Sequence, residues 1–230
     1  MNESNVPRIK NSNSFVILQK LKSIGIRSCG GVGAGAFLLC PAAPDTGTEL
    51  LDGVLNCDVR WRLGADIVAA DNRCCIGCRS RGYALCGAAL DTKGGHVAVC
   101  KFGGYKTTRH SQLVRLLRSL LRESGAAVQD REVEVAAWQR ADGTRARLDV
   151  AYQVEGASKY VDVTIRHPLA SKYVARASIL DGAAAEIAET AKRTRYPANA
   201  AAGLLAAEPF AIETFGRLGP AALQVLHEAR

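Results

Sequence analysis

The alternation of apolar and polar residues is most regular in the second half of the chain, where it predicts an α/β domain. Leucines recur every three or four residues and predict a helix over 111–124, with one apolar face made by Leu113, Leu116, Leu117, Leu120 and Leu121. Alternating residues then predict strands over 128–136, 147–154 and 159–166. A second helix is expected over 170–196, with a break near 181–182. This order favours an α+β fold with a mixed or antiparallel sheet flanked by helices.

The first half of the chain is less regular and divides into three segments. Residues 1–28 form a polar N-terminal segment, and residues 29–70 form a Gly/Pro-rich connector with a helix predicted over 49–63. Residues 71–105 are rich in cysteine and in loop-forming residues, as small metal-stapled modules are. Residues 106–230 then make up the α/β domain.

Composition excludes two classes of protein. Apolar residues make up 48% of the 230 residues, which is enough for a packed core and excludes a wholly disordered chain. No apolar run reaches the ~18 residues of a membrane span, which excludes a transmembrane protein. The first fourteen residues are polar and lack the apolar stretch of a signal peptide, so a nuclear or cytoplasmic protein is expected rather than a secreted one.

The charge balance indicates a polyanionic partner. Lys and Arg total 30 against 22 Asp and Glu, a surplus of +8. Each phosphate that Arg or Lys neutralises releases counterions, which favours binding to DNA, or to RNA as a second choice. The arginines of the 111–124 helix are candidates for these contacts, namely Arg115, Arg118 and Arg122. The alternative is a solvated basic surface without a partner.

Cysteine spacing predicts a structural zinc site in the third segment. Five of the eight cysteines lie there, and clustered cysteines in a reducing compartment are more often metal ligands than disulfides. Cys75 and Cys78 form a Cys-x2-Cys pair, and His96 and Cys100 form a His-x3-Cys pair. Two such pairs supply the four ligands of a tetrahedral zinc ion and leave no open position for catalysis. An alternative set joins one upstream cysteine to Cys86, His96 and Cys100.

Two aspartates on the predicted strands point to a second metal site. Asp149 and Asp162 both point away from the apolar rows of their strands, so pairing of the strands places them on one face. If residues 155–158 form the connecting loop, the carboxylates are diagonal neighbours, roughly 7–8 Å apart at the backbone. Such a pair can share Mg²⁺ or Mn²⁺, which positions water for phosphodiester hydrolysis. The alternative is two solvated carboxylates on an exposed sheet face.

A stripe of the following helix could complete such a site. Lys192 and Tyr196 lie on one face of the helix together with Glu189. A lysine that faces a metal-bound water can stabilise the attacking hydroxide or the charge on the phosphate. The simpler interpretation is an ordinary salt-bridged helix face.

These features occur in an order that resembles the C-terminal region of non-LTR retrotransposon proteins, which carries a zinc-binding motif and a restriction-like endonuclease. The resemblance covers about residues 70–220. The residues that carry it are the Cys/His cluster ending in Gly94–Cys100, then Arg109-His110, Asp149, Asp162 after twelve intervening residues, the Lys192–Tyr196 run and the Glu213–Arg217 run.

This resemblance implies a PD-(D/E)XK-type nuclease core that nicks target DNA so that reverse transcription starts from the break. It makes Asp149 and Asp162 the acids that bind the catalytic metal. Lys192 would be the catalytic lysine with Tyr196 beside it, and Glu134, or less readily Glu132, would be an accessory acid. Arg109 and His110 would belong to a motif that faces the DNA.

The chain also departs from that family. Leu148 stands where the family usually has proline, and Thr164 stands where conventional PD-(D/E)XK enzymes carry their lysine. No Tyr-x-Asp-Asp signature of a reverse transcriptase occurs, so we expect a fragment or a remnant that works with a reverse transcriptase absent from this chain. The competing hypothesis is a catalytically inactive, zinc-stapled module that binds nucleic acid.

Overall fold

The structure is a computed structural model that describes residues 23–32, 34, 52–69, 72–74, 77–78, 84–102, 104–139, 143–199, 203 and 206–228. Within these residues, no helix combines the length and the apolar composition that crossing a membrane requires. The described part of the chain mixes helices with a mixed sheet, as the sequence pattern predicts.

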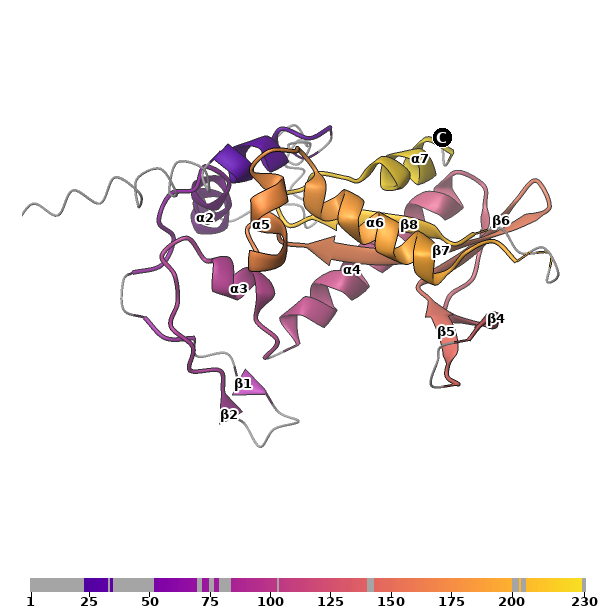
Figure 1. Cartoon of the computed structure of the whole chain (residues 1–230), viewed down its shortest axis with the longest axis horizontal. Coiled ribbons are helices and arrows are strands. Elements are labelled where there is room, and N and C mark those ends of the chain that lie inside the picture. The colour runs from indigo at the N-terminus through magenta and orange to yellow at the C-terminus, as the bar shows by residue number, and fades with distance from the viewer. Residues whose placement is uncertain are drawn as a thin grey trace, which may run out of the picture.

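A four-stranded mixed sheet forms the centre of the fold (Figure 1). Its strands lie in the order β3 (Ala127–Val128), β6 (Val150–Val154), β7 (Ala157–Arg166) and β8 (Glu208–Glu213). β6 pairs with both β3 and β7 in antiparallel orientation, whereas β8 runs parallel to β7. A separate hairpin is made by β4 (Val133–Gln139) and β5 (Arg145–Leu148), and it projects beside the sheet.

Helices cover both faces of this sheet. α4 (Tyr105–Glu123) and α7 (Pro220–Glu228) pack on one face in the main apolar core, which includes Leu117, Leu121, Val161, Val163, Phe210 and Val225. α6 (Ala183–Arg195) lies on the opposite face and follows α5 (Ser171–Ala177). There Ala185 and Ala188 of α6 meet Ala211 of β8. Small side chains let this helix approach the strands closely, which brings its polar residues within reach of the sheet.

The helix predictions are correct in outline and wrong in two details. The break near 181–182 is confirmed, since Gly182 takes a left-handed conformation with φ 75° between α5 and α6. α4 begins earlier than predicted, at Tyr105. Its leucines do not all form one buried face, because Leu116 and Leu120 are 55% and 38% exposed. The β8 strand and the α7 helix were not predicted.

The hairpin between β6 and β7 has a tighter turn than predicted. Glu155 and Gly156 form a two-residue turn with φ 50° and 79°, as a hairpin turn of the primed type requires. The ladder therefore pairs Val150 with Val161. This register differs from the predicted one by two residues, so both aspartates keep the same face.

The remaining elements pack at one end of the sheet. They comprise a helix over 23–29, α2 (Asp52–Arg62), α3 (Gly95–Val99) and a short hairpin of β1 (Gly77–Cys78) and β2 (Ala84–Leu85). Figure 1 shows this hairpin and the β4–β5 hairpin projecting from the same side of the molecule at opposite ends. Two polar contacts tie this end to β8 and the turn after it: the Ser28 hydroxyl donates to Glu213, and Arg62 donates to the Phe215 carbonyl at 2.7 Å.

Candidate functional site

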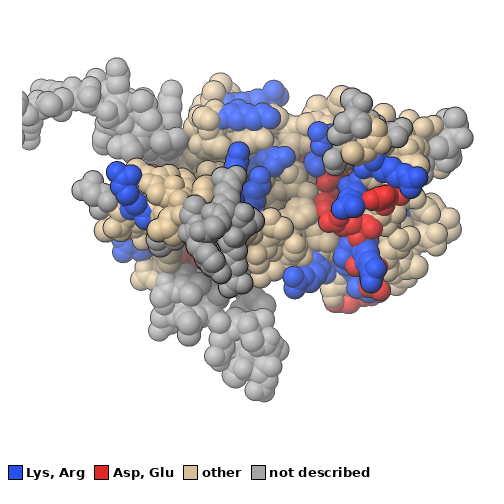
Figure 2. Space-filling view, turned by 90° about the horizontal axis from the view of Figure 1, so that it is seen from below, with Lys and Arg blue, Asp and Glu red and all other residues tan. Residues whose placement is uncertain are grey.

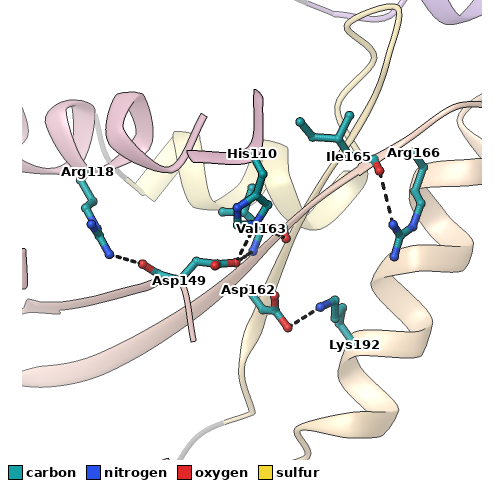
Figure 3. A network of polar contacts seen from close by, with 8 residues as sticks. All are labelled: His110, Arg118, Asp149, Asp162, Val163, Ile165, Arg166 and Lys192. Carbon is teal, nitrogen blue, oxygen red and sulfur yellow. Dashed lines mark hydrogen bonds and ion pairs between the residues drawn. The ribbon is translucent and has the colours of Figure 1, made fainter. Parts of the chain in front are cut away.

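The two aspartates lie side by side where β6 begins and pairs with β7 (Figure 3). Because Val150 pairs with Val161, the same register sets Asp149 opposite Asp162, closer than the diagonal arrangement predicted from sequence. Asp149 sits at the bend between β5 and β6, and its carboxylate accepts the Val163 amide at 2.7 Å. Both side chains are buried, with residue exposures of 8% and 5%.

A histidine reaches Asp149 from α4. The His110 Nε2 atom lies 3.3 Å from the Asp149 carboxylate and 3.2 Å from the Val163 carbonyl. The hydrogen bond with Asp149 raises the pKa of His110 above its ordinary value, although burial opposes this. We predicted His110 as a contact to nucleic acid, but its direct partner within the protein is one of the acids.

A lysine reaches Asp162 from the opposite direction. The Lys192 ammonium on α6 lies 2.5 Å from the Asp162 carboxylate, and its side chain is only 18% exposed. Figure 3 shows His110 and Lys192 approaching the pair of acids from two different helices. The structure therefore brings together the three residues that the sequence singled out, Asp149, Asp162 and Lys192.

The two carboxyl groups differ in their ionisation. Burial raises the pKa of Asp149, but His110 and the Val163 amide outweigh burial and hold that pKa below its usual range. Burial also raises the pKa of Asp162, and Lys192 only partly offsets burial and the nearby Asp149 charge, so this pKa lies above its usual range. Two neighbouring acids whose pKa values separate in this way are characteristic of functional carboxylate pairs.

A cleft of about 670 Å³ opens beside Asp149, between α4 and the β4–β5 hairpin. Its lining comprises His110, Ser111, Val114, Arg115, Arg118, Arg131, Glu132, Glu134, Arg147 and Asp149. In Figure 2, acidic side chains gather in one area of the face and Lys and Arg side chains border it. The cleft is thus polar, with four arginines and three carboxylates in its lining, and one of the buried acids is in its wall.

Other predicted site residues have structural partners. Arg118 donates to the backbone carbonyls of Asp149 at 2.5 Å and Asp130 at 2.7 Å, so it holds α4 against the strand that carries the acid. The Arg109 guanidinium donates to the Ala98 carbonyl at 2.6 Å and ties α4 to α3.

The two predicted accessory groups lie apart from the pair of acids. Glu134 stands on β4 in the cleft wall and pairs with Arg147 at 3.1 Å. Tyr196 is buried in the apolar cluster of the β4–β5 hairpin, and its ring lies against Trp138 with centroids 5.6 Å apart. Among the described residues, no hydrogen bond or ion pair joins either side chain to Asp149 or Asp162.

A second cluster lies near the β1–β2 hairpin and is made by Cys74, Cys86, His96 and Cys100. The four ligand atoms all lie within 4.8 Å of one another. The sulfurs of Cys74 and Cys100 are 3.8 Å apart, and the Cys86 sulfur is 3.4 Å from His96 Nε2. Tetrahedral zinc bonded to sulfur at about 2.3 Å separates two ligands by roughly 3.8 Å. The cluster can therefore bind a metal ion such as zinc.

This cluster corresponds to the alternative ligand set, with Cys74 as its upstream cysteine. Backbone pairing explains how Cys74 joins this cluster. The Cys74 amide bonds to the Ala88 carbonyl and so brings Cys74 beside the segment that follows Cys86. Of the other predicted ligands, Cys75 lies outside the described residues, and Cys78 belongs to β1 without a described side chain.

Comparison with known proteins does not extend these observations. No protein-family model matches the chain, and no curated protein matches it in sequence. Support for a function therefore comes from the residues of the chain itself.

Proposed function

We propose that this chain is a metal-dependent DNA endonuclease of the restriction-like type, related to those of non-LTR retrotransposons. The observation that carries the proposal is the pair of buried acids on neighbouring strands, with Lys192 in contact with Asp162. A buried carboxylate pair is unfavourable unless a cation compensates it. The cleft at the same place presents four arginines that can contact the phosphates of DNA.

Asp149 and Asp162 would hold the catalytic Mg²⁺ or Mn²⁺. Carboxylate oxygens are the ligands that these hard cations prefer, and the two acids already share one face of the sheet. The metal would supply charge neutralisation at the phosphodiester and a water of lowered pKa. His110 then orients Asp149 through its 3.3 Å contact and keeps that carboxylate ionised.

Lys192 would act on the phosphate. Its ammonium lies beside Asp162 on a helix that packs closely on the sheet, so it is held in place before substrate arrives. A fixed cation placed where negative charge develops stabilises the transition state of phosphoryl transfer. Thr164 is buried at the position where conventional enzymes carry their lysine, so α6 would supply the lysine instead.

The Cys/His cluster would have a structural role as a zinc site. Three thiolates and one imidazole complete a tetrahedral shell, which leaves no position for a reacting group. Arg109 connects this region to α4, and α4 carries His110 into the acidic site. Zinc would thus hold the start of α4 in place. Action on chromosomal DNA, together with a separate reverse transcriptase, would place the protein in the nucleus.

Plasmid nicking tests the proposal directly. Supercoiled plasmid is incubated with zinc-loaded protein and Mg²⁺ or Mn²⁺, and wild type is compared with Asp149→Asn, Asp162→Asn and Asp130→Asn. Asp130 is an exposed carboxylate paired with Arg122, so it is the matched control. We expect metal-dependent nicking by wild type and the control, and at least a 100-fold loss in the other two variants. Cutting that survives when Asp149→Asn and Asp162→Asn are combined in one protein would overturn the proposal.

A second candidate function is a zinc-stapled module that binds nucleic acid without cutting it. The ion pair between Lys192 and Asp162 favours this candidate, since it compensates one carboxylate without any metal. Binding would then fall steeply with salt and would not change when the acids are replaced. Tight, salt-dependent binding by folded protein that never nicks plasmid would select this function.

A further inference from the structure

A small cationic pocket lies away from the acidic site, at the other end of β7. Its volume is about 160 Å³, which equals about five water molecules at the ~30 Å³ that each occupies in the liquid. The start of α4, the end of β7 and the beginning of α5 form its walls, with α3 beside them. Its lining is Ala98, Val99, Lys106, Arg109, Ile165, Arg166, His167, Ala170, Tyr173 and Thr214.

The charged groups of this pocket all have the same sign. Lys106, Arg109 and Arg166 line it, and no carboxylate appears among its lining residues in the described part of the chain. Within that part, none of these three side chains forms an ion pair with Asp or Glu. Three cations around so small a space repel one another unless an anion joins them.

Two buried nitrogens of the pocket's lining residues have no hydrogen-bond partner in the described part of the chain. They are Arg166 Nε and His167 Nε2. His167 is only 5% exposed, and its Nδ1 atom lies 2.7 Å from the Thr214 hydroxyl. When that hydroxyl donates to Nδ1, the hydrogen of the neutral ring is on Nε2, which is then an unused donor. Buried donors without partners are rare and point to a missing acceptor.

We propose that this pocket binds a phosphate group through Lys106, Arg109, Arg166 and His167. A tetrahedral oxyanion supplies several acceptors at once, which matches the planar donor sets of the arginines and the single imidazole donor. The charge of one carboxylate, Asp91, acts on His167, but its oxygens already accept the amides of Gly95 and His96.

The position of the pocket identifies the phosphate as one of a polynucleotide backbone; this step rests on the proposed function. Asp162 and Arg166 are four residues apart on β7, which corresponds to roughly 13 Å along a strand. Figure 3 shows both residues on this strand. Each strand of B-DNA carries one phosphate per 3.4 Å of helix axis, so for a duplex whose axis runs along β7 the pocket lies about four base-pair steps from the acids. It would hold the DNA at a fixed distance from the point of cutting.

Titration with inorganic phosphate tests the pocket without any need for catalysis. Long-range nitrogen-proton NMR spectra of the histidine rings follow His167 in the zinc-loaded full chain. We expect a saturable shift of its resonances in wild type, and roughly tenfold weaker binding in Arg166→Gln.

Lys106→Gln is a second variant, because Lys106 is exposed and its replacement leaves the core intact. Arg176→Gln, at an exposed arginine of α5, should bind as wild type does. No saturable response in wild type, or equal binding by all the variants, would overturn the pocket.

A second experiment identifies the source of the phosphate. A short DNA duplex is added to the phosphate-loaded protein, and displacement of phosphate is read from the same His167 resonances. Displacement supports a backbone site, whereas joint binding of duplex and phosphate would overturn it. In the nicking assay, Arg166→Gln should raise KM several-fold and leave kcat unchanged. If no variant nicks, the endonuclease proposal fails, while the phosphate titration still decides the pocket.

Discussion

The Cys/His cluster and the pair of acids each gather polar side chains around a place for a cation, but they are built in opposite ways. The cluster draws Cys74, Cys86, His96 and Cys100 from one stretch of the chain, next to a two-stranded hairpin on which Leu85 is exposed. The acids stand on long central strands and are approached by residues from two helices, α4 and α6. Their surroundings include the largest apolar cluster among the described residues.

This difference shows which part of the protein depends on a metal. In the cluster, the sulfurs and the imidazole have mainly one another as partners, so only a metal ion binds all four together. In the acidic site, Lys192, His110 and the Val163 amide already compensate the carboxylates. We therefore expect the first region to lose its structure without metal and the second to keep it.

The largest effect should follow the loss of one cluster ligand. Cys100→Ser removes a thiolate from the proposed zinc shell, and apparent zinc binding contributes about 10–16 kcal/mol to the folding of small zinc domains. We expect the variant to purify without zinc. Hydrogen exchange over residues 84–102 should rise strongly, while residues 150–166 of the central sheet stay protected.

Cys57→Ser is the matched control for this experiment. Cys57 is an exposed cysteine of α2 outside the cluster. Its replacement should leave one zinc ion per chain and the exchange pattern of wild type. A Cys100→Ser protein that retains full protection over 84–102 without metal would show that the two regions do not differ in this way.

A smaller effect should follow removal of the lysine in the acidic site. Lys192→Met takes away the cation beside Asp162, and loss of one such group in an active site lowers rates by about 10²–10³-fold. The fold should persist, because Asp162 can take up a proton in its buried position. Nicking rates and thermal unfolding measure the two effects separately.

Arg193→Met changes the exposed neighbour on α6 and should retain activity. A variant that loses its fold and its activity together would contradict a purely catalytic role.

The smallest effect should appear at the junction between the two regions, where His167 is buried. Burial lowers its pKa from 6.5 to about 4, so the folded state favours the neutral ring. The unfolded chain binds a proton more readily, so stability is unaffected above pH 6.5 and falls as the pH decreases toward 4. At pH 5 we expect a loss of about 2 kcal/mol, measured by urea unfolding.

His167→Gln separates this effect from the other titrating groups. The acids and the cluster ligands titrate alike in both proteins, so the difference between the two stability curves reports His167 alone. That difference should shrink as the pH falls from 6.5 to 5. Parallel curves would show that the imidazole is not held neutral in the fold.

Sequence periodicity was sufficient to predict that the two acids share one face of the sheet, because they lie on regular strands. A strand has a side-chain period of two, so Asp149 and Asp162 stay on one face whether the turn has two residues or four. The helix period grouped Lys192 with Glu189 and Tyr196 on one face of α6, and in the structure Lys192 reaches Asp162 from this face. The approach of His110 from α4 depends on how two elements pack, which no local pattern contains.

The ligand set of the cluster could not be selected in the same way. Spacing favoured the Cys75 and Cys78 pair over Cys74, whereas the backbone pairing of Cys74 with Ala88 brings the Cys74 thiol to the cluster with Cys86. Burial of charged groups was also not predictable. Glu189, expected on an exposed stripe, is 2% exposed because it accepts the amides of Ala221 and Ala222 at the start of α7.

The helix α4 contacts both regions near its start, because Arg109 bonds to α3 and its neighbour His110 contacts Asp149. It has 19 residues and is therefore about 28 Å long. Arg109 attaches it near one end to α3, and Arg118 attaches it further along to the backbone of Asp130. A rigid rod of this length corresponds to about eight base-pair steps of a duplex that lies along it. Under the proposed function, this helix would set the minimal footprint on DNA, and duplexes shorter than about eight base pairs should engage only one of its ends.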